Sequence, residues 1–219
     1  MTDTLERYSS VLFDFDGTLA DSYAAIAASV NHVRAFHGLP ALPLDEVKRN
    51  VGRGAEYLLT HTVPGGKLKD DLALYRMHHP SVLATLTHLL PGTAELIPAL
   101  HRAGKKIALC SNKPRHFSVA ILEHFKLASC FSAILGPEDV PLPKPAPDMV
   151  RIAIEKLDVE CERAIYVGDM TVDIETARAA GVRVWAVPTG SDDWQTLKNA
   201  KPDRLLKDLT ELVAEVRGM

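Results

Sequence analysis

The chain has 219 residues, of which 47% are hydrophobic and 24% are charged. This composition is that of a folded protein with one domain and an insert, or with two small domains. With 25 Lys and Arg against 28 Asp and Glu, the formal charge is −3, which does not favour nucleic acid as a partner. There is no long apolar run and no signal-peptide pattern. We therefore expect no membrane partner and a cytoplasmic location.

The cysteines and histidines form no recognisable metal motif. Cys110, Cys130 and Cys161 are widely spaced, as expected for free thiols in a reducing compartment. Cys110 ends an apolar segment and is predicted to be a small core residue, with a nucleophilic role as the alternative. Adjacent helical positions do not face each other, so His78 and His79 are predicted on a solvated helix surface.

Apolar segments and helical patterns alternate along most of the chain. Buried strands are predicted at residues 11–15, 106–110, 133–135, 164–167 and 183–187. Helices are predicted at 93–103, 115–124, 147–157 and 173–180, and residues 202–219 as a polar connector and a final helix. This alternation predicts an α/β fold with a doubly wound, Rossmann-like parallel sheet.

The first two predicted strands are unusually far apart. About ninety residues separate them, whereas a whole βαβ unit needs only about thirty. The additional residues are predicted to form helices at 23–37, 44–51, 55–60 and 68–90, with Pro80 inside the last helix and no strong strand. We predict a core of residues 1–19 and 91–219 and a helical insert of residues 20–90. The insert is either a lid over the first strand's end or an ordinary helical subdomain.

The most informative motif follows the first predicted strand. Asp14 and Asp16 are two positions apart, and Gly17 and Thr18 come next. Two carboxylates this close repel each other unless they share a cation or a proton. They also lie where open α/β sheets bind ligands. The motif indicates a Mg²⁺ site, acid–base chemistry or both; an acidic turn is the simpler alternative.

Polar residues follow two further predicted strands. Ser111 and Asn112 follow the strand at 106–110 and would suit a phosphate oxygen, although the pair taken alone favours a helix cap. Gly168 and Asp169 follow the strand at 164–167; the glycine permits close backbone approach, and the aspartate can bind a hard cation. Asp173, four residues on, could orient water, a lysine or the metal shell, or could simply favour the helix N-terminus.

Lys144 lies in a segment with prolines on both sides, Pro141-Leu-Pro-Lys144-Pro-Ala-Pro147. The prolines restrict the backbone and would hold the ammonium in one place. A fixed cation beside carboxylates can neutralise a phosphoryl group. A solvated loop lysine is the alternative.

Taken together, these motifs resemble the haloacid dehalogenase superfamily. The matching elements occur in the family's order: DxDGT at 14–18, Ser111-Asn112, Lys144 in KPxP, and GDxxxD at 168–173. The insert resembles that superfamily's C1 cap. Within the superfamily, the segments LADSYAAIAASVN, GLP, VGRGAEYLL, SNKP and GDMTVDIETARAAGV are most similar to phosphoglycolate phosphatases.

The resemblance implies a role for each matching residue. Asp14 would be the nucleophile that forms an aspartyl phosphate, and Asp16 the general acid and base. Mg²⁺ would be held by Asp14, the backbone carbonyl of Asp16 and Asp169. Ser111 and Lys144 would hold phosphate oxygens, with Asn112 beside them, and Thr18 would position Asp16 or its loop.

The implied function is Mg²⁺-dependent hydrolysis of a small phosphorylated metabolite, first of all 2-phosphoglycolate. Arg53 of the insert would bind a substrate carboxylate, or would be a solvated loop cation. Three related functions are disfavoured. Dehalogenases of the superfamily lack the second aspartate, which is present here as Asp16, and phosphonatases carry a cap lysine that is absent after Gly54. A receiver module, from a different class, has no helical insert. A sugar phosphomutase and a catalytically silent phosphate-binding protein stay open as alternatives, as does the choice between monomer and homodimer.

Overall fold

A computed structural model describes residues 3–219 of the chain. Its core is a six-stranded parallel sheet with the order β5-β4-β1-β6-β7-β8. The strands are β1 (Ser10–Phe13), β4 (Lys106–Cys110), β5 (Ala133–Leu135), β6 (Ala164–Gly168), β7 (Arg183–Ala186) and β8 (Arg204–Leu205). The chain starts in the middle at β1, builds one edge through β4 and β5, and then returns to build the other. The predicted α/β doubly wound fold is confirmed.

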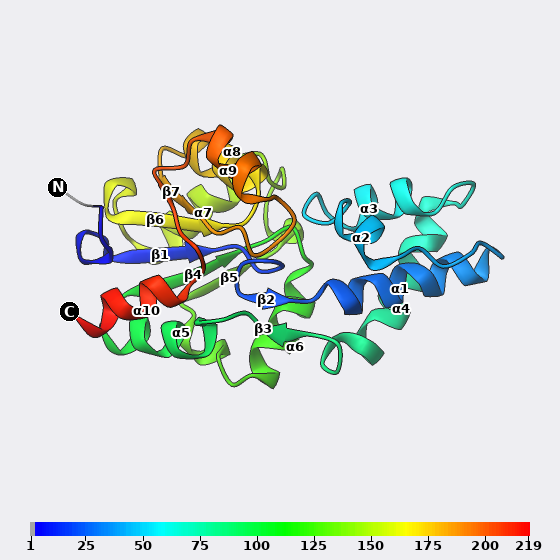
Figure 1. Ribbon diagram of the computed structural model, residues 1–219, viewed down its shortest axis with the longest axis horizontal. Coiled ribbons are helices and arrows are strands. Elements are labelled where there is room, and N and C mark those ends of the chain that lie inside the picture. The colour runs from blue at the N-terminus through cyan, green and yellow to red at the C-terminus, as the bar shows by residue number, and fades with distance from the viewer. Residues whose placement is uncertain (1–2) are drawn as a thin grey trace.

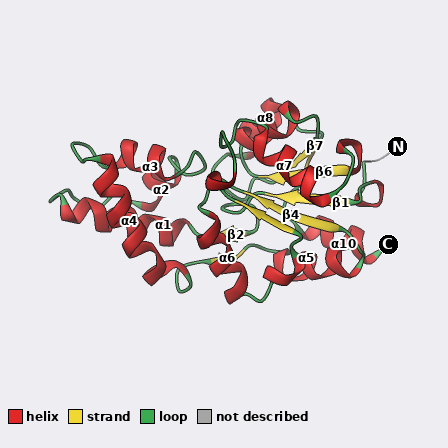
Figure 2. Ribbon diagram, turned by 180° about the vertical axis from the view of Figure 1, so that it is seen from behind, coloured by secondary structure: helices red, strands yellow, loops and turns green. Residues whose placement is uncertain are grey.

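Helices cover both faces of the sheet (Figure 2). One face carries α5 (Thr93–Arg102), α6 (Arg115–His124) and α10 (Thr210–Arg217); the other carries α7 (Asp148–Leu157), α8 (Thr171–Ala179) and α9 (Trp194–Ala200). Successive strand side chains point to opposite faces, so Val11 and Phe13 pack in one apolar cluster and Leu12 in the other. Because both faces of β1 are buried, its sequence is apolar throughout.

The insert forms a second helical body at the carboxyl ends of the strands (Figure 1). It contains α1 (Tyr23–Phe36), α2 (Leu44–Lys48), α3 (Ala55–Thr62) and α4 (Leu68–Leu83), which share an apolar cluster of their own around Val30, Val33, Leu59 and Tyr75. A short antiparallel ribbon of β2 (Ala20–Asp21) and β3 (His88–Leu89) joins the insert to the core.

This ribbon adds two short strands to an insert for which the sequence predicted helices and no strong strand. The helix predicted at 68–90 ends at Leu83, and β3 follows it. Each ribbon strand has two residues, which is too short for side-chain alternation to appear in the sequence. The ribbon places the two chain crossings between core and insert side by side.

The prediction for His78 and His79 was wrong for the second residue. His79 is fully buried, and its Nδ1 lies 2.9 Å from Ser29 Oγ, because α4 packs along α1. Burial, reinforced by the nearby charge of Lys113, lowers the pKa of His79 to about 2.

Several element boundaries also differ from prediction. The first strand ends at Phe13 and β7 at Ala186, each earlier than predicted, and α8 begins at Thr171. In the predicted polar connector, β8 pairs with β7, and α9 was not predicted. Asp193 is the N-cap of α9, and its Oδ1 accepts a hydrogen bond of 2.7 Å from the backbone N of Thr196.

The three cysteines are free. Cys110 is buried in the core as predicted, and burial raises its pKa to about 12, which disfavours the nucleophilic thiolate. Among the described residues, none of the helices has the length and apolar character needed to cross a bilayer.

Candidate active site

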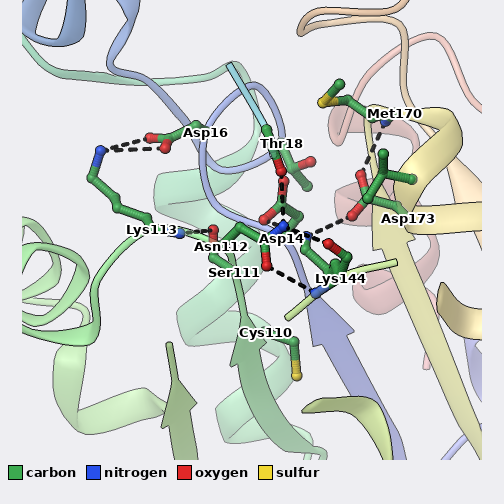
Figure 3. A network of polar contacts seen from close by, with 12 residues as sticks. Asp14, Asp16, Thr18, Cys110, Ser111, Asn112, Lys113, Lys144, Met170 and Asp173 are labelled. Carbon is green, nitrogen blue, oxygen red and sulfur yellow. Dashed lines mark hydrogen bonds and ion pairs between the residues drawn. The ribbon is translucent and has the colours of Figure 1, made fainter. Parts of the chain in front are cut away.

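Three parallel strands bring the predicted site residues together. Asp14 follows β1, Ser111 follows β4 and Asp169 follows β6, and these strands are neighbours in the sheet. Parallel strands end on the same edge, so residues far apart in sequence meet there (Figure 3). This edge also faces the helical insert.

Asp14 and Lys144 form a buried ion pair. The backbone N of Asp14 donates to the carbonyl of Val167 at 3.0 Å, which fixes the residue just beyond the strand. Asp14 Oδ1 lies 2.8 Å from Lys144 Nζ. The same oxygen is buried and receives no well-aligned hydrogen bond, so it keeps a lone pair for another ligand.

Lys144 is also held by Asp173 and Tyr166. Its Nζ lies 2.7 Å from Asp173 Oδ1 and 3.0 Å from the Tyr166 hydroxyl. Burial alone would lower the pKa of Lys144, but the attraction of Asp14 and Asp173 outweighs it and raises the pKa above its ordinary value. Lys144 is therefore a charged ammonium that Asp173 and Tyr166 hold in place beside Asp14.

Gly168 makes room for the Asp173 carboxylate. A Cβ at Gly168 would lie 2.4 Å from Asp173 Cγ, which no real contact allows. Asp173 Oδ2 accepts from the backbone N atoms of Asp169 and Met170 at 3.1 and 3.0 Å. Burial raises the pKa of Asp173 to about 6, although Lys144 pulls it down. Both Asp173 oxygens thus have donors, and this residue positions Lys144.

Asp169 lies in a second carboxylate pocket beside Asp14. Thr18 Oγ1 donates to Asp169 Oδ1 at 3.0 Å, and the Ser191 backbone N donates to Oδ2 at 2.9 Å. The structure thus places Thr18 against Asp169, whereas the sequence had suggested Asp16 or its loop. Burial, with the charges of Asp173 and Asp14 nearby, raises the pKa of Asp169 well above its ordinary value.

The cluster of Asp14, Asp169 and Asp173 is compatible with a divalent cation. One carboxylate oxygen from each lies within 4.8 Å of the others, and all three residues are buried. Lys144 contacts Asp14 and Asp173, whereas the pKa of Asp169 is raised by burial and by these two neighbouring carboxylates, whose repulsion a divalent cation would offset. The lone pair left on Asp14 Oδ1 is the further observation that fits a bound cation.

Asp16 points away from Asp14 and faces a different lysine. Gly17 has a φ of 90°, and the turn that it permits carries the second carboxylate toward the insert. Asp16 Oδ1 and Oδ2 lie 3.1 and 3.2 Å from Lys113 Nζ, and Ser22 Oγ also donates to Oδ1. The two motif carboxylates therefore have separate cationic partners, as Figure 3 shows.

Asn112 binds backbone groups on both sides of the site. Its Nδ2 donates to the Lys144 carbonyl at 2.9 Å and to the Gly52 carbonyl of the insert at 3.0 Å. Its Oδ1 accepts from the backbone N of Lys144 at 3.0 Å. Ser111 Oγ accepts from the backbone N of Lys113 at 3.3 Å and lines the cavity.

A small cavity of about 40 Å³ lies between core and insert. The core contributes its polar lining, including Asp14, Asp16, Ser111 and Lys113, whereas the insert contributes chiefly apolar and aromatic side chains. Arg53 does not line this cavity. It is exposed, lies 5.4 Å from the centre of the Tyr57 ring, and borders an adjoining depression of about 580 Å³ that shares Gly54 and Asn112 with the cavity.

Comparison with known proteins agrees with this geometry. Residues 11–187 match the family described as haloacid dehalogenase-like hydrolase. The chain belongs to the haloacid dehalogenase-like hydrolases. Phosphoglycolate phosphatase 1 of Pseudomonas aeruginosa is 31% identical over 212 residues, covering 93% of this chain and 78% of the relative. The plasmid phosphoglycolate phosphatase of Cupriavidus necator is 32% identical over 83% of this chain and 81% of the relative.

Solved structures of this hydrolase family have the same fold. The crystal structure of a predicted phosphoglycolate phosphatase from Haemophilus somnus superposes with a TM-score of 0.89 at 26% identity, covering 95% of this chain and 97% of that one. CbbY from Rhodobacter sphaeroides, crystallised with phosphate, has a TM-score of 0.82 at 26% identity over 94% and 96% of the two chains. Within the haloacid dehalogenase-like hydrolases, this protein is a phosphoric monoester hydrolase similar to phosphoglycolate phosphatases.

Sequence reasoning missed several contacts in this hydrolase site. Lys113 lies in the SNKP segment, two residues after Ser111 and at the same strand end. A cation at this position could have indicated a residue of the site. Tyr166 lies inside β6, where a tyrosine is typical of a core strand. Ser22 and Ser191 reach Asp16 and Asp169 from other loops, which no local pattern indicates.

Proposed function

We propose that the protein is a Mg²⁺-dependent phosphomonoester hydrolase that works through an aspartyl-phosphate intermediate on a small phosphorylated metabolite, first of all 2-phosphoglycolate. The observation that carries this proposal is the buried Asp14 beside Lys144, at the edge of a three-carboxylate cluster. A carboxylate held next to a fixed ammonium is suited to attack a phosphoryl group whose negative charge the ammonium neutralises.

Asp14, Asp169 and the backbone carbonyl of Asp16 would hold the Mg²⁺ ion. Oxygen ligands and net negative charge are what this ion requires. When bound, the ion would neutralise charge on the phosphoryl oxygens. Asp173 has both oxygens occupied by Lys144, Tyr166 and backbone donors, which supports a role in positioning Lys144 rather than in direct ligation.

In the first half-reaction, an Asp14 oxygen forms a bond to phosphorus and the bond from phosphorus to the leaving alcohol oxygen breaks. Asp16 gives its proton to that oxygen. Lys144 and Ser111 hold the phosphoryl oxygens. In the second half-reaction, Asp16 takes a proton from a water that attacks phosphorus, and Asp14 leaves as the free carboxylate. The products are the alcohol and inorganic phosphate.

Two observations support a small substrate. The named relatives are phosphoglycolate phosphatases, and the insert covers the cavity beside Asp14. A sugar phosphomutase would need groups for a second phosphate; Arg53 lies outside this cavity, and Lys113 is the one cationic side chain among the described residues that line it. A catalytically silent binder would not need Asp16, whose carboxylate borders the cavity.

Residues 20–90 are proposed to act as a cap on the core formed by 1–19 and 91–219. The insert lies over the strand ends and supplies Val51, Gly52, Leu58 and Tyr75 to the cavity. Such a cover would exclude water from the first half-reaction. Arg53, at the mouth of the larger depression, is proposed to attract anionic substrates from solution.

The test is phosphate release from 2-phosphoglycolate, p-nitrophenyl phosphate and a panel of sugar phosphates, with Mg²⁺ and with a chelator. We expect Mg²⁺-dependent release, with the largest kcat/KM on 2-phosphoglycolate and none above background in Asp14→Asn. Asp70→Asn, an exposed substitution in the insert, is the matched control. Absence of phosphate release by the wild-type protein across the panel would refute the proposal.

A further inference from the structure

Lys113 occupies an unusual position in the cavity. Its side chain is 4% exposed, and it is the one cationic side chain among the described residues that line this cavity. It follows β4 by three residues, lines the cavity together with Asp16 and pairs with that carboxylate (Figure 3). Nothing in the proposed phosphoryl chemistry uses it.

The two buried lysines have different partners. Lys144 hydrogen-bonds Asp173 and Tyr166 and lies 2.8 Å from Asp14 Oδ1, on the phosphoryl side of the site. The contacts of Lys113 Nζ in the described part of the chain are with the two oxygens of Asp16, at 3.1 and 3.2 Å. Lys113 therefore has at least one N–H donor that these contacts do not use, and its side chain lines the cavity.

The rest of that side of the cavity offers little to a charged group. Ile26, Val51, Leu58 and Phe117 are apolar, and His79 is held neutral by burial. A carboxylate buried there without a cation would pay a large desolvation penalty. A carboxylate bound to a buried ammonium forms a strong, charge-assisted hydrogen bond.

We propose that Lys113 is a specificity-determining residue that binds a carboxylate on the leaving group of the substrate. The inference rests on the proposed function and deepens it, because it restricts the substrates to small phosphomonoesters whose leaving alcohol carries an anionic group close to the phosphate. The simpler alternative is that Lys113 serves only as the counter-ion of Asp16, in which case it affects all substrates alike.

The test compares 2-phosphoglycolate with 2-hydroxyethyl phosphate, which has the same two-carbon skeleton and a neutral hydroxymethyl group in place of the carboxylate. The measured quantity is the ratio of the two kcat/KM values in the wild type, in Lys113→Met and in Lys69→Met, an exposed lysine of the insert used as control. If Lys113→Met does not fold, Lys113→Gln takes its place.

We expect the wild type and Lys69→Met to prefer 2-phosphoglycolate by at least about tenfold, and Lys113→Met to lose most of this preference, mainly through KM. A wild-type ratio near one, or an equal loss on both substrates in Lys113→Met, would overturn the inference while leaving the phosphatase proposal intact. Failure of the wild type to release phosphate from either compound would instead refute the proposed function itself.

Discussion

Asn112 holds the backbone of Lys144 from two sides, as Figure 3 illustrates. Asn112 Nδ2 lies 2.9 Å from the Lys144 carbonyl oxygen, and Asn112 Oδ1 lies 3.0 Å from the Lys144 backbone N. The same Nδ2 reaches Gly52 of the insert at 3.0 Å. One buried side chain therefore ties the lysine loop to the insert.

Replacing Asn112 with Asp tests this link. The substitution keeps the size and the Oδ1 acceptor but places an oxygen against two carbonyl oxygens. We expect the free energy of unfolding to fall by about 1–3 kcal/mol. We also expect kcat to fall at least about tenfold, because the ammonium moves. Urea unfolding and steady-state kinetics measure both. Asn199→Asp on the exposed face of α9 is the control, and equal behaviour of the two variants would refute the link.

Metal binding should stabilise the fold through the acidic cluster. At about one hundred times its dissociation constant, a ligand that binds only the native state adds about 2.7 kcal/mol. We expect Mg²⁺ to raise the midpoint of thermal unfolding of the wild type and of Asp70→Asn. Asp169→Asn should show little or no rise. A rise of equal size in Asp169→Asn would show that the ion binds elsewhere.

Gly168→Ala should displace the Asp173 carboxylate and so disturb the position of Lys144. The added Cβ would overlap the Asp173 carboxylate, which must then shift together with its hydrogen bonds to Lys144. Overpacking of this kind costs about 1–3 kcal/mol. We expect this loss in urea unfolding and a clear fall in kcat. Gly218→Ala is the control, because a Cβ there meets its nearest atom at 3.5 Å. Wild-type activity in Gly168→Ala would contradict the geometry.

His79 should make the fold sensitive to mild acid. Its pKa falls from 6.5 to about 2 on burial, so below pH 6.5 the unfolded chain binds a proton that the native protein does not. Stability therefore falls as pH decreases from 6.5, by about 2 kcal/mol at about pH 5. Urea unfolding at about pH 7.5 and pH 5 measures this loss. Between these two pH values, the free energy of unfolding should fall less in His79→Leu than in the wild type or in the exposed control His101→Leu. Equal falls in all three proteins would contradict the lowered pKa of His79.

The layered fold and most of the site could be predicted because each depends on local patterns. The apolar strands, and the polar residues that follow them, are contiguous in sequence, and parallel strand ends necessarily meet. The β2–β3 ribbon, the burial of His79 and the pairing of Asp16 with Lys113 depend on how the insert packs against the core. These are long-range contacts, and no local periodicity reports them.

The position of Arg53 also depends on more than the local sequence. The sequence left a substrate contact and a solvated loop position open for Arg53, and the loop places it at the Tyr57 ring and the outer depression. Two residues away, Val51 lines the inner cavity. A change of backbone direction over two residues decides which side chain can face the phosphoryl site.

The central claim is that Asp14 carries the phosphoryl group and Asp16 the proton. It is tested most directly by rapid-mixing kinetics of Asp16→Asn with p-nitrophenyl phosphate and Mg²⁺. Nitrophenolate leaves without a proton, so the first half-reaction should proceed while the second, which needs the base, is slow. The account predicts a burst of about one nitrophenolate per active site, with phosphate on the peptide containing Asp14, and no burst in Asp14→Asn. Linear release without a burst in Asp16→Asn, or a burst that persists in Asp14→Asn, would contradict it.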